Sequence, residues 1–203
     1  MTINNTHDRL QSEACLNELD PILQRILQDA NEVTRLLNKD ASGLGMEPVA
    51  IQEFIVSVGY RLVRVHTLNG PPLENKLAGA YHIGLIAFIT TLFLQSGGRH
   101  FLRYKLVARC LESVIERRLS LDEEDQDIML WLLFIGGISV LTEEENDSWL
   151  LLRITSVVQM ADVKSWTQLQ QRLAQFPWIS SIHDEPGAAL WRTAMARAIT
   201  KDG

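Results

Sequence analysis

The chain has 203 residues, of which 46% are hydrophobic and 22% are charged. This length suits one domain, and this composition excludes an intrinsically disordered chain. The net charge of −6 disfavours nucleic acid as a partner of the whole surface. Two cysteines, Cys15 and Cys110, are too few for a disulfide framework, and the polar N-terminus lacks the features of a secretory signal or a transit peptide. We therefore expect a cytoplasmic or nuclear protein that is not secreted.

Apolar residues recur at steps of three and four along most of the chain, which is typical of amphipathic helices. No stretch alternates with period two, so we expect no sheet. Residues 1–19 are predicted to form a polar arm, and residues 20–203 a single domain. The fold class is therefore all-α, a bundle of about seven or eight helices. The predicted helices span residues 20–40, 48–68, 73–95, 101–115, 120–141, 149–160, 163–175 and 184–199.

The stretch from Ser120 to Leu141 is predicted to be the central helix of this bundle. Ser120 and Glu123 form a capping-box pattern, and from Ile128 onward only two glycines and one serine interrupt the apolar run. Other helices must therefore surround it. The pair Gly136-Gly137 indicates a close helix approach, a kink or room for a ligand. Neither this run nor residues 85–94 reaches the length that crosses a bilayer, so no membrane contact is predicted.

Residues 122–127, DEEDQD, superficially resemble the aspartate-rich magnesium sites of terpenoid cyclases. Such sites need a second ligand set from another helix, and the residues around Asn146 and Asp147 lack it. We interpret the acids as compensation for the helix dipole, and we predict neither a metal nor a cofactor.

Two histidines are candidates for acid–base chemistry. His82 lies in a helix predicted to be buried, and His183 is followed by Asp184 and Glu185. No nucleophile motif accompanies either of them. A buried histidine that bonds a backbone carbonyl is the competing interpretation for His82, and a place in the cap of the last helix is the competing interpretation for His183.

Five tryptophans fall in the last third of the chain, and their rings either line an apolar cavity or fill the core. We expect such a cavity between the helix at 81–94, the central helix and residues 178–191. The candidate ligand-binding residues are Tyr81, Trp131, Phe134, Trp149 and Trp178. A basic set that includes Arg99, Arg103, Lys105, Arg109 and Arg117 lacks a nucleic-acid recognition motif, and we interpret it as a solvated, ion-paired face.

The order of segments resembles the regulatory domain of fungal zinc-cluster transcription factors. The stretches that carry the resemblance are YHIGLIAFITTLFL (81–94), 116–141, SWLLLRI (148–154) and WTQLQQRLAQFPWISSIHDEPGAALW (166–191). The resemblance implies an all-helical domain that senses a metabolite or a partner and controls activation. The six-cysteine zinc cluster of these regulators is missing, so direct DNA binding is not expected. The chain is then a fragment of a longer regulator or a freestanding helical domain, and Met1 favours the second.

These observations lead to three hypotheses. The first is a domain that binds a small apolar metabolite or a protein partner. The second is a cofactor-free cyclase, isomerase or pericyclase-like enzyme of fungal secondary metabolism, which would use His82, His183, Trp131 and Trp178. The third is a dimerisation module, which predicts a large apolar surface patch and a homodimer.

Overall fold

The computed structural model describes residues 19–39, 47–94, 104–117, 126–141 and 144–201. Those residues form eight α-helices and no strand, so the predicted all-α fold is confirmed. Most of the predicted N-terminal arm and most of the acid cluster at 122–127 lie outside the described residues. The helices are α2 (Pro21–Lys39), α3 (Pro48–Val65), α4 (Lys76–Leu94), α5 (Lys105–Arg117), α6 (Gln126–Ser139), α7 (Glu144–Met160), α8 (Trp166–Leu173) and α9 (Ser180–Lys201).

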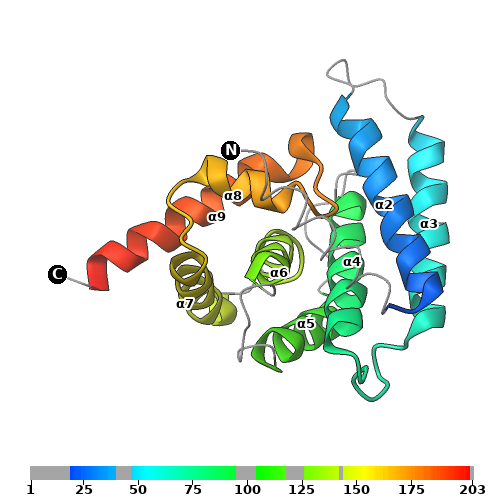
Figure 1. The fold of residues 1–203 in the computed structure, drawn as a ribbon, viewed down its shortest axis with the longest axis horizontal. Helices are drawn as coiled ribbons and strands as arrows, with labels where there is room; N and C mark the ends of the chain where they lie inside the picture. The colour runs from blue at the N-terminus through cyan, green and yellow to red at the C-terminus, as the bar shows by residue number, and fades with distance from the viewer. Residues whose placement is uncertain (1–18, 40–46, 95–103, 118–125, 142–143, 202–203) are drawn as a thin grey trace, which may run out of the picture.

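Helix α6 lies at the centre of the bundle, as predicted. Figure 1 looks nearly along its axis and shows the other helices around it. It contacts α4, α5, α7, α8 and α9. Every side chain from Met129 to Ile135 is fully buried. Because α6 is apolar on all faces, it has no side that could face water without losing the burial that stabilises the fold.

Helices α2 and α3 form an outer layer that packs against α4 (Figure 1). The buried stripe of α2, which includes Leu23, Ile26 and Ala30, faces inward. Asp20 caps this helix, because its Oδ1 accepts a hydrogen bond from the Ile22 N–H at 2.8 Å. The described part of the chain therefore has a core around α6 and an outer helix pair that α4 connects to it.

The last helix begins earlier than predicted. The sequence rule that proline occupies the first turn placed its start at Asp184, whereas α9 begins at Ser180 and contains Pro186 within it. Two side chains explain the earlier start: the Ile179 N–H donates to His183 Nδ1 at 2.8 Å, and the Ser180 N–H donates to Asn38 Oδ1 at 2.8 Å. These bonds satisfy amides that a helix start leaves without partners. His183 thus belongs to the cap of α9.

Two other helices begin later than predicted because of polar caps. Helix α4 begins at Lys76, where Asn75 Oδ1 accepts from the Ala78 N–H at 3.0 Å. Helix α8 begins at Trp166, and the Ser165 hydroxyl accepts from the Gln168 N–H at 3.3 Å. Both caps are side chains that bond the free amides of the first turn.

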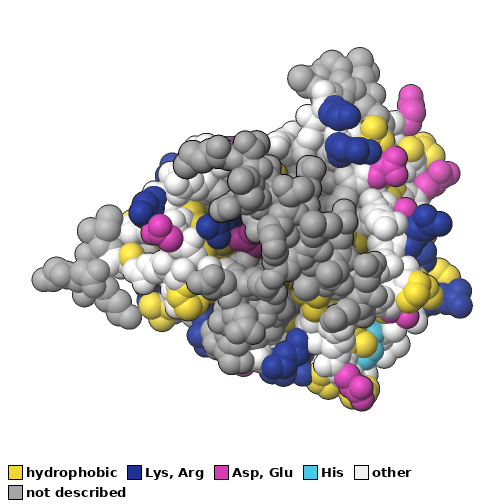
Figure 2. Space-filling model, viewed as in Figure 1, with side chains coloured by type: hydrophobic (Ala, Val, Ile, Leu, Met, Phe, Trp, Pro, Cys, Tyr) yellow, Lys and Arg dark blue, Asp and Glu magenta, His cyan; other side chains and the backbone are white. Residues whose placement is uncertain are grey.

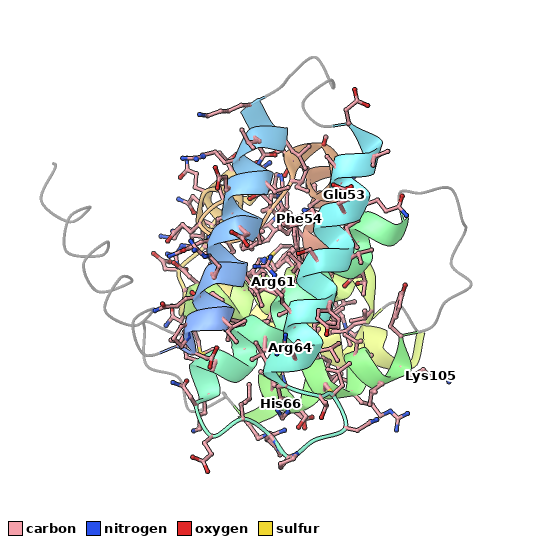
Figure 3. The ribbon with its side chains drawn as sticks, turned by 90° about the vertical axis from the view of Figure 1, so that its right-hand side faces the viewer. Glu53, Phe54, Arg61, Arg64, His66 and Lys105 are labelled. Carbon is pink, nitrogen blue, oxygen red and sulfur yellow. The ribbon has the colours of Figure 1, made fainter. Side chains whose placement is uncertain are left out.

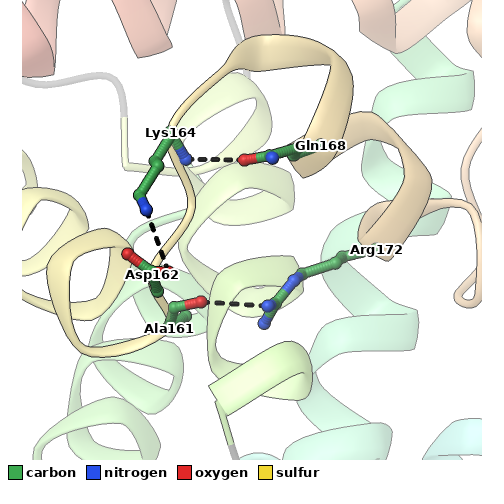
Figure 4. A network of polar contacts seen from close by, with 5 residues as sticks. All are labelled: Ala161, Asp162, Lys164, Gln168 and Arg172. Atoms are coloured by element: carbon green, nitrogen blue, oxygen red, sulfur yellow. Dashed lines mark hydrogen bonds and ion pairs between the residues drawn. The ribbon is translucent and has the colours of Figure 1, made fainter. Parts of the chain in front are cut away.

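A polar network fastens α8 to its neighbours (Figure 4). One guanidinium nitrogen of Arg172 lies 2.9 Å from Asp127 Oδ1 at the start of α6, and another donates to the Ala161 carbonyl at 2.9 Å. Asp162 follows with a positive φ of 49°, which turns the chain after α7. The network joins the ends of three helices, α6, α7 and α8.

Glycines permit the closest helix approaches. A Cβ at Gly84 of α4 would overlap the Trp131 ring of α6. A Cβ at Gly136 would overlap Leu111 of α5, and one at Gly137 would lie 2.6 Å from Leu190 of α9. Close helix approach is therefore the explanation that the structure supports for the glycine pair in the central helix.

These contacts predict opposite effects for two glycine-to-alanine substitutions. Gly84→Ala should lower the free energy of unfolding by about 1–3 kcal/mol, because the new methyl group overpacks against Trp131. Gly59→Ala on α3 should raise it by about 0.5–1 kcal/mol, because nothing lies within 4 Å of a Cβ there. Urea denaturation in dilute solution measures both values. Equal stability of the two variants would contradict the packing of α4 on α6.

Candidate ligand-binding site

A pocket with a volume of about 330 Å³ lies between the segment after α3, helix α4 and helix α5. This volume falls within the range of small-molecule sites in proteins. The segment contributes residues from His66 to Leu73, and the two helices contribute the rest. The lining residues are His66, Leu68, Gly70, Pro72, Leu73, Lys76, Gly79, His82, Ile83, Leu106, Arg109, Cys110, Ser113, Val114 and Arg117.

The segment between α3 and α4 shapes one wall of the pocket. Helix α3 ends where the His66 N–H bonds the Leu62 carbonyl, and a turn follows in which the Gly70 N–H donates to the Thr67 carbonyl at 2.9 Å. Pro71 and Pro72 come next and cannot continue a helix after this turn. The chain therefore crosses the end of the bundle in an irregular segment before α4 begins.

Gly79 gives the pocket its depth on the α4 side. A Cβ at this position would meet only the Leu73 Cβ, at 3.9 Å, so helix packing does not require a glycine. A glycine inside a helix costs about 1 kcal/mol relative to alanine. The missing side chain leaves open volume next to the other lining residues.

The charged side chains that line the pocket are cationic. Lys76, Arg109 and Arg117 line it, and no aspartate or glutamate does so among the described residues. Arg117 bonds the backbone carbonyl of Ser113 at 3.1 Å and also its hydroxyl, which holds the guanidinium along α5. Figure 2 shows lysine and arginine side chains at the lower edge of the molecule, over α5. A local cationic site thus exists on a chain with a net charge of −6.

His82 lies in the pocket wall and is neutral at pH 7. Its Nε2 lies 2.9 Å from the Leu62 carbonyl oxygen, so the ring hydrogen is on Nε2 and Nδ1 is an acceptor. Burial is the main cause that lowers the pKa of His82, and the neighbouring His66 ring lowers it further. The hydrogen bond to the Leu62 carbonyl has the opposite effect and raises the pKa, but it is weaker than burial. The two rings meet edge to face with centroids 5.7 Å apart.

Cys110 is the other polarisable group in the wall. Its thiol donates to the Leu68 carbonyl across an Sγ–O distance of 3.4 Å. Burial raises the pKa of this thiol, against the opposing effect of Arg109 and Arg117. The protonated thiol is therefore the form at neutral pH, and it is a poor nucleophile.

His183 lies in the core and not at the pocket. Its Nδ1 accepts from the Ile179 N–H, so its hydrogen is on Nε2, which donates to Thr91 Oγ1 at 2.8 Å. The Thr91 hydroxyl in turn donates to the Phe88 carbonyl. Burial lowers the pKa of His183 to about 3. Both ring nitrogens thus have hydrogen-bond partners within the core.

The candidate aromatic residues belong to the core or pack against it. Trp131 is fully buried, stacks on Phe176 with centroids 5.3 Å apart, and donates to the Pro177 carbonyl at 3.2 Å. Trp178 is also buried and donates to Asp184 Oδ1 at 2.8 Å.

The other three rings join the same core. Phe134 is fully buried beside Trp166. Tyr81 and Trp149 are half-buried against the core. Of all the candidate residues, His82 is the one that lines the pocket.

The sequence contains features of this pocket in three separate places. The breaker Asn69-Gly70-Pro71-Pro72 marks an irregular segment, Gly79 marks a missing side chain, and Arg109 and Arg117 belong to the basic set. Only the fold brings the segment, α4 and α5 together around one volume.

No protein-family model matches this chain, and neither does any curated protein or solved structure. The resemblance to regulatory domains of fungal zinc-cluster transcription factors therefore stays a prediction. The described residues include no helix long and apolar enough to cross a membrane. They also include no group of three or more histidine, cysteine, aspartate or glutamate side chains placed to hold a metal ion.

The buried His183 predicts a pH dependence of stability. Its pKa in the folded protein, about 3, lies below the ordinary value of 6.5, so below pH 6.5 the unfolded chain takes up a proton that the folded chain does not. The neutral His183 therefore contributes its full stabilisation above pH 6.5. As the pH falls from 6.5 toward 3, the free energy of unfolding decreases by up to about 1.4 kcal/mol per pH unit.

Urea denaturation of the wild type and of His183→Asn over pH 3.5–7.5 tests this effect. Asparagine retains an acceptor for the Ile179 N–H but does not titrate. The variant should be less stable at pH 7.5 and should lose less stability than the wild type on acidification. Parallel pH profiles would contradict a neutral, buried His183.

Proposed function

We propose that this chain is a ligand-binding helical domain, and that its ligand is a small molecule with an apolar body and an acidic group. The observation that carries the proposal is the pocket between the segment after α3, α4 and α5. Its volume of about 330 Å³, its mixed apolar and cationic lining and its opening to the surface suit such a molecule.

The apolar side chains of the pocket favour an apolar ligand body. Leu68, Leu73, Ile83 and Val114 line it, and each is also part of the core or packs against it. Their surfaces within the pocket gain about 25 cal/mol for each Å² that a ligand removes from water. Because the core holds these side chains in place, the walls need little rearrangement on binding.

The cationic side chains favour an acidic group on the ligand. A carboxylate, sulfonate or phosphate near Arg109 and Lys76 would form charge-assisted hydrogen bonds, which are about twice as strong as neutral ones. His82 and Cys110 are uncharged at neutral pH, so they do not oppose an anion. The acidic group would therefore lie at the rim and the apolar body inside.

A sensing role fits this site better than a catalytic one. The resemblance to regulatory domains implies that a metabolite or a partner controls activation, and the pocket supports the metabolite. Among the residues considered for the enzyme hypothesis, His183 and Trp131 are occupied by core hydrogen bonds. No arrangement of described residues favours a particular reaction.

A pair of fluorescent probes tests the site. N-phenyl-1-naphthylamine is a neutral aryl amine, and 8-anilinonaphthalene-1-sulfonate has the same body with a sulfonate. Both should bind saturably with one-to-one stoichiometry. Gly79→Leu should weaken both at least about tenfold, because its side chain fills the pocket, while Gly79→Ala should bind nearly as the wild type does.

Covalent labelling locates the bound probe. In a Cys15→Ser background, saturating N-phenyl-1-naphthylamine should slow the reaction of Cys110 with a maleimide, because Cys110 lines the pocket. Failure of both probes to bind, or equal binding by Gly79→Leu and Gly79→Ala, would refute the proposed site.

The acidic group has a separate test. Arg109→Gln and Lys76→Gln should each weaken the sulfonate probe by about three- to tenfold and leave the neutral probe unchanged. Arg25→Gln on α2 is the matched control, because this arginine is exposed and does not line the pocket. If Arg109→Gln changes the affinities of the two probes equally, the pocket is still a site for apolar molecules, but the proposal that the ligand carries an acidic group is wrong.

A further inference from the structure

The outer face of α3 carries an apolar stripe. Val49, Val56, Tyr60 and Val63 are each 58–64% exposed, although α3 packs firmly through Ile55, Val58 and Leu62 on its other face. Figure 3 looks onto this side of the molecule, with α3 in front. Their spacing of seven, four and three residues places the four side chains along one line of the helix, as in the contact seam of paired helices.

A glycine lies beside the stripe, and packing among the described residues does not require it. Gly59 lies in the middle of α3, and a Cβ at this position would meet nothing within 4 Å. Glycine destabilises a helix relative to alanine, and no close contact within the described residues requires it here. A missing side chain on an outer face allows the backbone of another helix to approach closely.

Two opposite charges lie beside the stripe at its two ends. Glu53 lies toward the start of α3 and Arg64 toward its end (Figure 3). They are eleven residues apart, which is about 16 Å along a helix, and the helical repeat places both on the same side of the stripe. Neither forms an ion pair within the described residues, and Arg64 lies over the Tyr60 ring at 5.9 Å.

This arrangement is complementary to itself. When two copies of α3 pack antiparallel about a two-fold axis, equivalent sides of the two helices face each other. Glu53 of each copy then meets Arg64 of the other, and Val56 meets Tyr60. Gly59 of both copies lies close to the axis, on the opposite side of the stripe from the charges. The apolar seam, the glycine and the charge pair thus fit one register.

We propose that α3 is the contact surface for a second copy of this chain, packed antiparallel about a two-fold axis near residues 58 and 59. The proposal does not depend on a ligand in the pocket. A foreign helix would need its own matching charges, whereas the second copy supplies them from the same two residues.

Sedimentation equilibrium tests the interface. The wild type should form dimers at concentrations up to about 200 µM. Glu53→Arg and Arg64→Glu should each weaken dimerisation by at least about tenfold, because each variant places like charges together twice in the dimer. The double variant Glu53→Arg/Arg64→Glu should restore the wild-type affinity to within about threefold, because it exchanges the partners of both pairs.

An equimolar mixture of the two single variants should form heterodimers, because one chain then supplies two arginines and the other two glutamates. Gly59→Leu is a further test: leucine favours the helix and its Cβ meets nothing within 4 Å, so the fold should be retained while the close approach is blocked. Circular dichroism and urea denaturation confirm that each variant is folded.

A wild type that stays monomeric over this range would overturn the proposal. So would a double variant that dimerises as weakly as the single variants, since a parallel dimer or a foreign partner predicts no rescue.

Discussion

The fold depends on the contact between α4 and α6. Gly84 leaves room for the Trp131 ring, Phe176 stacks on that ring, and the Pro177 carbonyl accepts its N–H. Burial of this indole joins α4, α6 and the segment before α9 in one contact. From Leu85 to Leu92 every side chain of α4 except Ile86 is then buried, whereas the first turns of α4 are partly open to solvent. The pocket lies against these first turns, which is why Lys76 and Gly79 are available to line it.

The polar groups inside the protein are uncharged, and the charged groups are at the rim. His82, His183 and Cys110 all have pKa values that burial shifts toward the neutral form. Each also has a hydrogen bond to a carbonyl, a hydroxyl or a backbone amide. The charged groups that line the pocket are therefore the cations Lys76, Arg109 and Arg117. Their electrostatic field selects a ligand by the charge at its end more than by polar atoms along its body.

Much of the fold could be predicted from the sequence, because it depends on local patterns. The starts of α2 and α3 follow from Asp20-Pro21 and Pro48, and the uniform apolarity of α6 indicates its central place. The start of α9 could not be predicted in this way, because Asn38, far away in the chain, bonds its first turn. Local rules therefore favour a start at Asp184 with Pro186 in the first turn, whereas a long-range bond stabilises the start at Ser180.

The candidate site was harder to predict than the fold. Large aromatic side chains in a sequence can either fill a core or line a cavity. In this protein Trp131 and Phe134 fill the core. An open pocket depends instead on volume that no side chain occupies, as at Gly79, and on segments that only the tertiary structure brings together. His82 was identified because a histidine in an apolar helix is conspicuous in any sequence.

One side chain connects the beginning and the end of the described chain. The Asn38 amide donates to the Trp178 carbonyl at 2.8 Å while its oxygen accepts from the Ser180 N–H at 2.8 Å. These two bonds close a loop of about 140 residues, so their entropic cost is met only once the intervening helices are in place. The final turn of α2 and the first turn of α9 thus stabilise each other across most of the described chain. Loss of the Asn38 amide would remove a hydrogen-bond partner from the Trp178 carbonyl and from the Ser180 N–H together.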